Sequence, residues 1–125
     1  SATASRFDAG TPPVANAYIA RAGMEIINSI GVHNIRSWLE ILGKRLIDGG
    51  RARGLTVHGT LDMARKTATT AFVVADSHGV EVAMRARGVL PAARGPVIRL
   101  APHFYNTLND VDTALDVLVS VVADS

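Results

Sequence analysis

The sequence has 125 residues, is 48% hydrophobic and carries a formal net charge of +2, which supports one domain with a single core. Its 13 basic residues are scattered and do not alternate with aromatic residues, so a nucleic-acid-binding surface is not expected. The absence of cysteine excludes disulfides, thiolate metal sites and a cysteine nucleophile. No apolar run approaches the ~20 residues that cross a bilayer, so we expect a cytoplasmic protein without a membrane partner.

Two amphipathic helices are predicted in the first half of the chain. Thr11, followed by two prolines, is typical of a helix start, and the first helix is predicted over residues 14–30. Its apolar residues recur at steps of three and four and predict one buried stripe, formed by Ile19, Ala22, Gly23, Ile26, Ile27 and Ile30. The second helix is predicted over residues 33–53, although Gly49 and Gly50 could end it early.

Short strands dominate the middle of the chain, and a helix ends it. In chain order we predict a strand at 55–58, a strand at 68–75, a helix at 80–87, a strand beginning at Val89-Leu90, its partner strand at 97–101 and a helix at 108–123. Thr107 and Asp110 resemble a capping box at the start of the last helix. The buried stripe of that helix is predicted to comprise Leu108, Val111, Leu115, Leu118, Val119 and Val122.

Strands bunched between helices predict an α+β fold. The expected architecture is a two-layer domain with a small antiparallel or mixed sheet, covered by helices on one face. The sequence contains no internal repeat, so we expect residues 1–125 to form a single domain.

Arg99 is the most unusual residue of the predicted strands. It lies among Val97, Ile98 and Leu100, where few partners for a charge are expected. It could form an internal ion pair with a carboxylate such as Asp8 or Asp110. Alternatively, its two-pronged guanidinium could hold a carboxylate or phosphate of a ligand.

Two motifs bracket the chain and resemble one family. Residues 99–107, Arg-Leu-Ala-Pro-His-Phe-Tyr-Asn-Thr, are similar to the C-terminal signature of the class V aminotransferases, which are fold type I pyridoxal-phosphate enzymes. Residues 6–13, Arg-Phe-Asp-Ala-Gly-Thr-Pro-Pro, resemble the segment that begins the C-terminal portion of these proteins. The residues of both motifs most closely resemble those of the kynureninase branch.

The resemblance implies roles for three residues. Arg99 matches the arginine that binds the α-carboxylate of the amino-acid substrate. Gly10 and Thr11 match a segment that reaches the cofactor phosphate across a homodimer interface, in agreement with the preference of anions for helix starts. Thr11 as a plain helix cap explains the same residues, and the two interpretations are compatible. His103, Tyr105 and Asn106 could support the edge of the active site, but a turn that Asn106 stabilises by bonding its own backbone is the simpler interpretation.

The chain lacks a lysine in the sequence context that binds pyridoxal phosphate. Only Lys44, in a predicted helix, and Lys66, in a polar loop, are present. We therefore expect residues 1–125 to be the C-terminal small domain of a larger enzyme, with the cofactor-binding domain elsewhere and no activity in isolation. The resemblance implies pyridoxal 5'-phosphate in the parent enzyme. Because Pro91 to Arg94 contains no cysteine where desulfurases of the family have one, desulfurase activity is not expected.

A second hypothesis is a free-standing α+β binding or dimerisation module without chemistry. A chain of this length with capped helices and a full core could fold alone, and Arg99 would then form an internal ion pair.

The excess of arginine over lysine and the many alanines are typical of GC-rich bacterial genomes.

Overall fold

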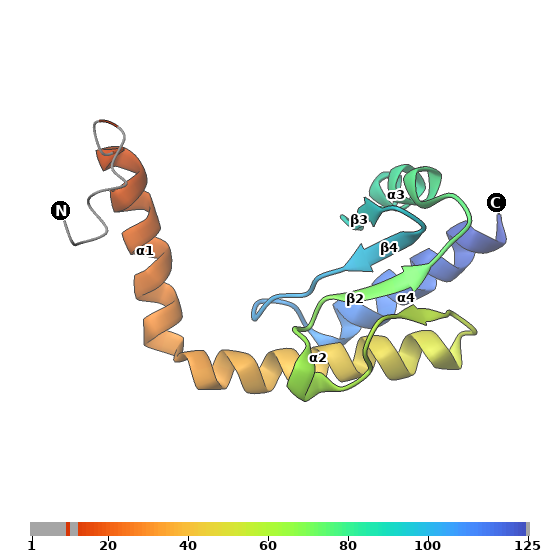
Figure 1. Cartoon of the computed structure of the whole chain (residues 1–125), viewed down its shortest axis with the longest axis horizontal. Helices are drawn as coiled ribbons and strands as arrows, with labels where there is room; N and C mark the ends of the chain where they lie inside the picture. Colours follow the sequence, from red (N-terminus) through yellow and green to blue (C-terminus); the bar gives the residue numbers. More distant parts are fainter. Residues whose placement is uncertain (1–9, 11–12, 125) are drawn as a thin grey trace. The chain divides into compact units, whose positions relative to one another are not determined.

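The structure, a computed structural model, describes residue 10 and residues 13–124 (Figure 1). The chain divides into two compact units, residues 1–35 and 36–125, and each is a separate body. The first unit contains the helix α1 and the first turn of α2. The second contains the remainder of α2, the sheet and the last two helices.

Helix α1 spans Val14–Ile30, as predicted. Gly31 ends it with φ +90°, a conformation that favours glycine, and its N–H donates to the Ile27 carbonyl at 2.9 Å. The predicted burial of its apolar stripe is wrong for the described residues, since no α1 residue is buried and Ile19 is 72% exposed. An amphipathic stripe is buried only where another apolar surface covers it.

The second unit is built on a four-stranded antiparallel sheet. The strands are β1 (Val57–His58), β2 (Thr70–Val73), β3 (Ala92–Arg94) and β4 (Val97–Leu100). Their order is β1-β2-β4-β3, and every neighbouring pair is antiparallel. The α+β prediction is therefore confirmed, with the antiparallel alternative realised.

One predicted strand begins later than expected. The predicted pairing with β4 across Gly95 and Pro96 is present, but β3 starts at Ala92, three residues after Val89. The reason is the short link between the strands. A two-residue connection at Gly95 and Pro96 sets Arg94 opposite Val97, so the residues that precede Arg94 must pair with the rest of β4.

Three helices supply the rest of the core: α2 (Val32–Ala52), α3 (Ser77–Ala86) and α4 (Leu108–Ala123). Helix α3 begins three residues earlier than predicted because the Asp76 carboxylate accepts the N–H of Gly79 at 3.0 Å and caps it. A short 3-10 turn, η2 (Met63–Arg65), joins β1 to β2. The core cluster comprises Leu42, Leu46, Phe72, Val74, Val80, Met84, Ile98, Leu100, Val111, Leu115, Leu118 and Val121.

The glycine pair in α2 does not end the helix but lets neighbours pack closely. A Cβ at Gly49 would come within 2.8 Å of Leu115 Cδ1, and one at Gly50 would overlap the ring of Phe72. Both glycines are buried, so their small size allows α4 and the sheet to approach α2.

Gly50→Ala should therefore destabilise the second unit by about 1–3 kcal/mol through overpacking against Phe72. Urea unfolding followed by circular dichroism would measure it. Gly23→Ala in α1 is the matched control, because nothing lies within 4 Å of a Cβ there. It should leave stability unchanged or raise it by about 0.5–1 kcal/mol. Equal effects of the two substitutions would contradict the packing explanation.

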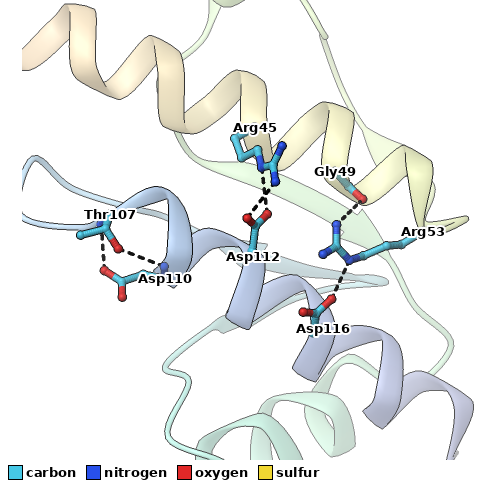
Figure 2. Close-up of polar contacts among 7 residues, drawn as sticks. All are labelled: Arg45, Gly49, Arg53, Thr107, Asp110, Asp112 and Asp116. Carbon is cyan, nitrogen blue, oxygen red and sulfur yellow. Dashed lines mark hydrogen bonds and ion pairs between the residues drawn. The ribbon is translucent and has the colours of Figure 1, made fainter.

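Ion pairs connect α2 to α4 on the solvent side (Figure 2). Arg45 donates to both carboxylate oxygens of Asp112 at 2.8 Å each. Arg53 donates to Asp116 at 2.8 Å and to the Gly49 carbonyl at 3.1 Å. The hydrogen bonds from Arg45 lower the pKa of Asp112 below its ordinary 3.8.

This pairing gives stability a pH dependence. Because the folded-state pKa of Asp112 is below 3.8, its contribution is present above that pH and is lost as the pH falls through the lower folded-state value. Wild type should therefore be more stable than Asp112→Asn at pH 7, and the difference should shrink as the solution is acidified. Unfolding midpoints measured across this range would test it. A difference that is independent of pH would contradict the ionic origin.

Candidate functional site

Arg99 lies on the sheet face opposite the core cluster of the second unit. Along β4, Ile98 and Leu100 belong to the core cluster, so the alternation of strand side chains directs Arg99 to the opposite face. Its Nε is buried and has no hydrogen-bond partner within the described residues. A buried donor without a partner is uncommon in folded proteins and calls for an explanation.

The internal ion pair considered for Arg99 is not found within residues 13–124. Asp110 is engaged elsewhere, because its carboxylate accepts the Thr107 N–H at 2.8 Å. The other named partner, Asp8, lies outside the described residues. The guanidinium is thus available to an acceptor from outside the described part of the chain.

Small residues flank Arg99 on both sides. The register sets it opposite Ala71 on β2 and Ala92 on β3, and residues directly opposite each other share a face. Neither alanine side chain extends beyond its Cβ, so the sheet leaves room beside the guanidinium. His58 pairs with Ala71 and ends the same row, and its side chain is exposed.

The loop after β4 is fixed by two anchors. Asn106 Oδ1 accepts the His103 N–H at 2.9 Å, which confirms the predicted turn, and the Asn106 carbonyl accepts the indole N–H of Trp38 at 3.0 Å. The predicted capping box is also present, since the Thr107 hydroxyl accepts the Asp110 N–H at 3.1 Å (Figure 2). The bond from the Thr107 N–H lowers the pKa of Asp110.

Three rings lie together in this loop. His103 stacks on Tyr105 with a centroid distance of 5.2 Å and meets Phe104 edge-on at 4.7 Å. Tyr105 is 73% exposed. His103 Nδ1 is buried without a hydrogen-bond partner in the described part of the chain.

The remaining candidate residues give separate results. Gly10 is described as an exposed bend, whereas Thr11 lies outside the described residues. Lys44 is exposed and pairs with Asp48 at 2.8 Å. Lys66 donates to the Thr70 hydroxyl at 2.9 Å, and burial lowers the pKa of its ammonium group.

A groove of about 660 Å³ lies between residues 88–90, residues 100–106 and the first turns of α4. Its lining includes Tyr105, Asn109 and Asp110 but not Arg99. Asp110, the ionisable carboxylate among the described lining residues, accepts the Thr107 N–H in the capping box.

Sequence reasoning missed three structural roles in this part of the molecule. Trp38 is half-buried and holds the loop through its indole N–H. The need of a partly buried indole for an acceptor could have indicated this. Arg36 donates to the backbone carbonyls of Met63 and Lys66 and thereby ties α2 to the segment before β2. Asp112 of α4 pairs with Arg45 of α2.

Comparisons with known proteins identify a family. Residues 1–113 match the family described as Aminotransferase class-V. The uncharacterized aminotransferase YcbU of Bacillus subtilis (strain 168) is 34% identical over 116 residues, which cover 90% of this chain and 30% of that protein. A probable cysteine desulfurase of Pyrococcus abyssi (strain GE5 / Orsay) is 27% identical over 132 residues, covering 94% of this chain and 33% of that protein.

A solved structure shares the fold. The apo structure of a cysteine desulfurase from Thermococcus onnurineus NA1 matches with a TM-score of 0.86 over 98% of this chain and 34% of that chain, at 23% identity. The present fold is thus that of a domain of fold type I pyridoxal-phosphate enzymes.

The chain belongs to the class V aminotransferase family, a family of pyridoxal-phosphate-dependent enzymes. It spans about a third of the length of the relatives that it matches. Within the described residues, no helix is both long and apolar enough to cross a membrane. The same residues contain no group of three or more side chains arranged to hold a metal ion.

Trp38→Phe should loosen the loop that follows Arg99, since it removes the hydrogen bond to Asn106 but retains an aromatic ring. The expected cost is about 1 kcal/mol. Amide hydrogen exchange should accelerate at His103 and Asn106, while the amides in the middle of α4 keep their protection. Uniform acceleration throughout the second unit would instead indicate general destabilisation.

Proposed function

We propose that this chain is the C-terminal small domain of a cytoplasmic, homodimeric pyridoxal-phosphate enzyme that acts on an amino acid. In this proposal Arg99 binds the α-carboxylate of the substrate. A further domain, outside residues 1–125, supplies the cofactor-binding lysine. The domain described here would be inactive alone.

One observation carries the proposal: the buried Nε of Arg99 has no acceptor within the described residues, although the side chain is held at the centre of a rigid sheet. A carboxylate from outside would complete it, because a guanidinium matches a carboxylate through two parallel hydrogen bonds. The flanking residues Ala71 and Ala92 leave space for such a ligand. A strand also fixes the orientation of the guanidinium before the substrate arrives.

Gly10 and Thr11 are proposed to contact the cofactor phosphate of the partner subunit. The exposed backbone at Gly10 is compatible with close approach of an anion, and Thr11 precedes the start of α1. When bound, the cofactor would withdraw electrons from the substrate α-carbon. The task of this domain would be to orient the substrate for that chemistry.

The proposal covers three reaction types. Transamination, side-chain hydrolysis of the kynureninase kind and epimerisation all require a bound amino-acid carboxylate and differ in residues beyond this domain. The similarity of the two motifs to the kynureninase branch favours side-chain hydrolysis. Residues 91–94, now seen to be Pro91 and strand β3, contain no cysteine, which disfavours desulfuration.

Arg99→Gln in the full-length native protein should reduce kcat/KM for the amino-acid substrate roughly 10- to 100-fold, the worth of charged hydrogen bonds. Stability should be unchanged within about 0.5 kcal/mol, because no described residue pairs with Arg99. Steady-state kinetics and thermal unfolding would measure the two effects.

Two further variants sharpen this test. Arg99→Lys keeps the charge without the two-pronged geometry and should give an intermediate loss. Arg51→Gln removes an exposed arginine of α2 and should have no effect on kinetics. Unfolding of Arg99→Gln, with unaltered kinetics in the folded fraction, would contradict the substrate role.

The visible spectrum of the full-length native protein tests the cofactor. A yellow band that borohydride abolishes, with the cofactor then fixed to a lysine outside residues 1–125, is the expected result. A colourless product that binds no added pyridoxal phosphate would overturn the enzyme assignment and favour a binding module.

A further inference from the structure

A second arginine shares this sheet face with Arg99. Arg94 ends β3 and pairs with Val97, two residues before Arg99 on β4. Directly opposite residues share a face, and Val97 lies on the Arg99 side of its strand, so Arg94 does too. Arg94 and Arg99 are therefore diagonal neighbours, whose Cα atoms are expected about 7 to 8 Å apart.

The shared face has no acid to neutralise these charges. Its side chains are His58, Ala71, Val73, Ala92, Arg94, Val97 and Arg99. Within residues 13–124, neither arginine takes part in an ion pair or a side-chain hydrogen bond. By contrast, Arg45, Arg53 and Arg87 each pair with an aspartate of α4 or with the residue that follows it.

Two adjacent cations on one small face repel each other, and an anionic ligand between or above them would offset this repulsion. The alanines beside Arg99 leave that space open. Arg94 is exposed, at the end of the strand next to the turn, so its long side chain can reach outward to a group that extends beyond the α-carboxylate. One ligand with two carboxylates would satisfy both guanidinium groups.

We propose that Arg94 is a specificity-determining residue that binds a second carboxylate, on the side chain of an acidic amino-acid substrate. This inference rests on the proposed function, in which Arg99 binds the α-carboxylate. The substrate class is then a dicarboxylic amino acid.

The test uses the full-length native protein loaded with pyridoxal phosphate. Dissociation constants are obtained by titrating its visible absorption with L-aspartate and L-glutamate and with their neutral isosteres L-asparagine and L-glutamine. The wild type should bind at least one acid roughly tenfold or more tightly than its amide, the worth of one charged hydrogen bond. Arg94→Gln should reduce this ratio to about one and leave amide affinity unchanged.

Two control variants separate the roles. Arg99→Gln should weaken binding of acids and amides alike, because both carry the α-carboxylate. Arg65→Gln removes an exposed arginine of η2, outside the sheet, and should change nothing.

The opposing outcomes are distinct. The role of Arg94 is overturned if the wild type binds acids and amides equally, or if Arg94→Gln keeps the preference for the acid. In either case, a large effect of Arg99→Gln on ligand binding would still uphold the proposed function. Loss of pyridoxal phosphate from Arg94→Gln would show that Arg94 binds the cofactor phosphate and would also overturn the inference. No effect of Arg99→Gln on any ligand overturns the proposed function itself.

Discussion

The register of β4 between β2 and β3 is the constraint on which the rest of the candidate site depends. Ile98 and Leu100 are fixed in the core, so Arg99 between them must face the other side of the sheet. A slip of one residue would turn the guanidinium into the core and expose two large apolar side chains. The two-residue link between β3 and β4 prevents that slip, because it sets Arg94 opposite Val97.

The packing behind the sheet keeps this register rigid. Glycines in α2 let the helix approach Phe72 and Leu115 closely, and arginines of the same helix pair with aspartates of α4. At the end of β4, the bond from Trp38 to Asn106 and the capping box of α4 hold the loop. The Arg99 side chain is thus supported by a strand whose two ends and helical face are all fixed.

Membership of the class V aminotransferase family gives this arrangement its context. The chain corresponds to about a third of each relative it matches, and in the described part Arg99 lacks an acceptor. The unsatisfied guanidinium of Arg99 supports our proposal that this domain binds the carboxylate of a ligand. Within the first unit, the apolar stripe of α1 is a second exposed surface.

The sequence by itself determined the fold class, the bounds of α1 and α4 and the capping box. These features are local: periodicity, cap chemistry and a charge within an apolar strand are readable from neighbouring residues. Only the tertiary structure decided that Gly49 and Gly50 stay within α2, that β3 begins at Ala92, and that Arg94 shares a face with Arg99. Those outcomes depend on cross-strand register and on contacts between residues far apart in sequence, which no local pattern encodes.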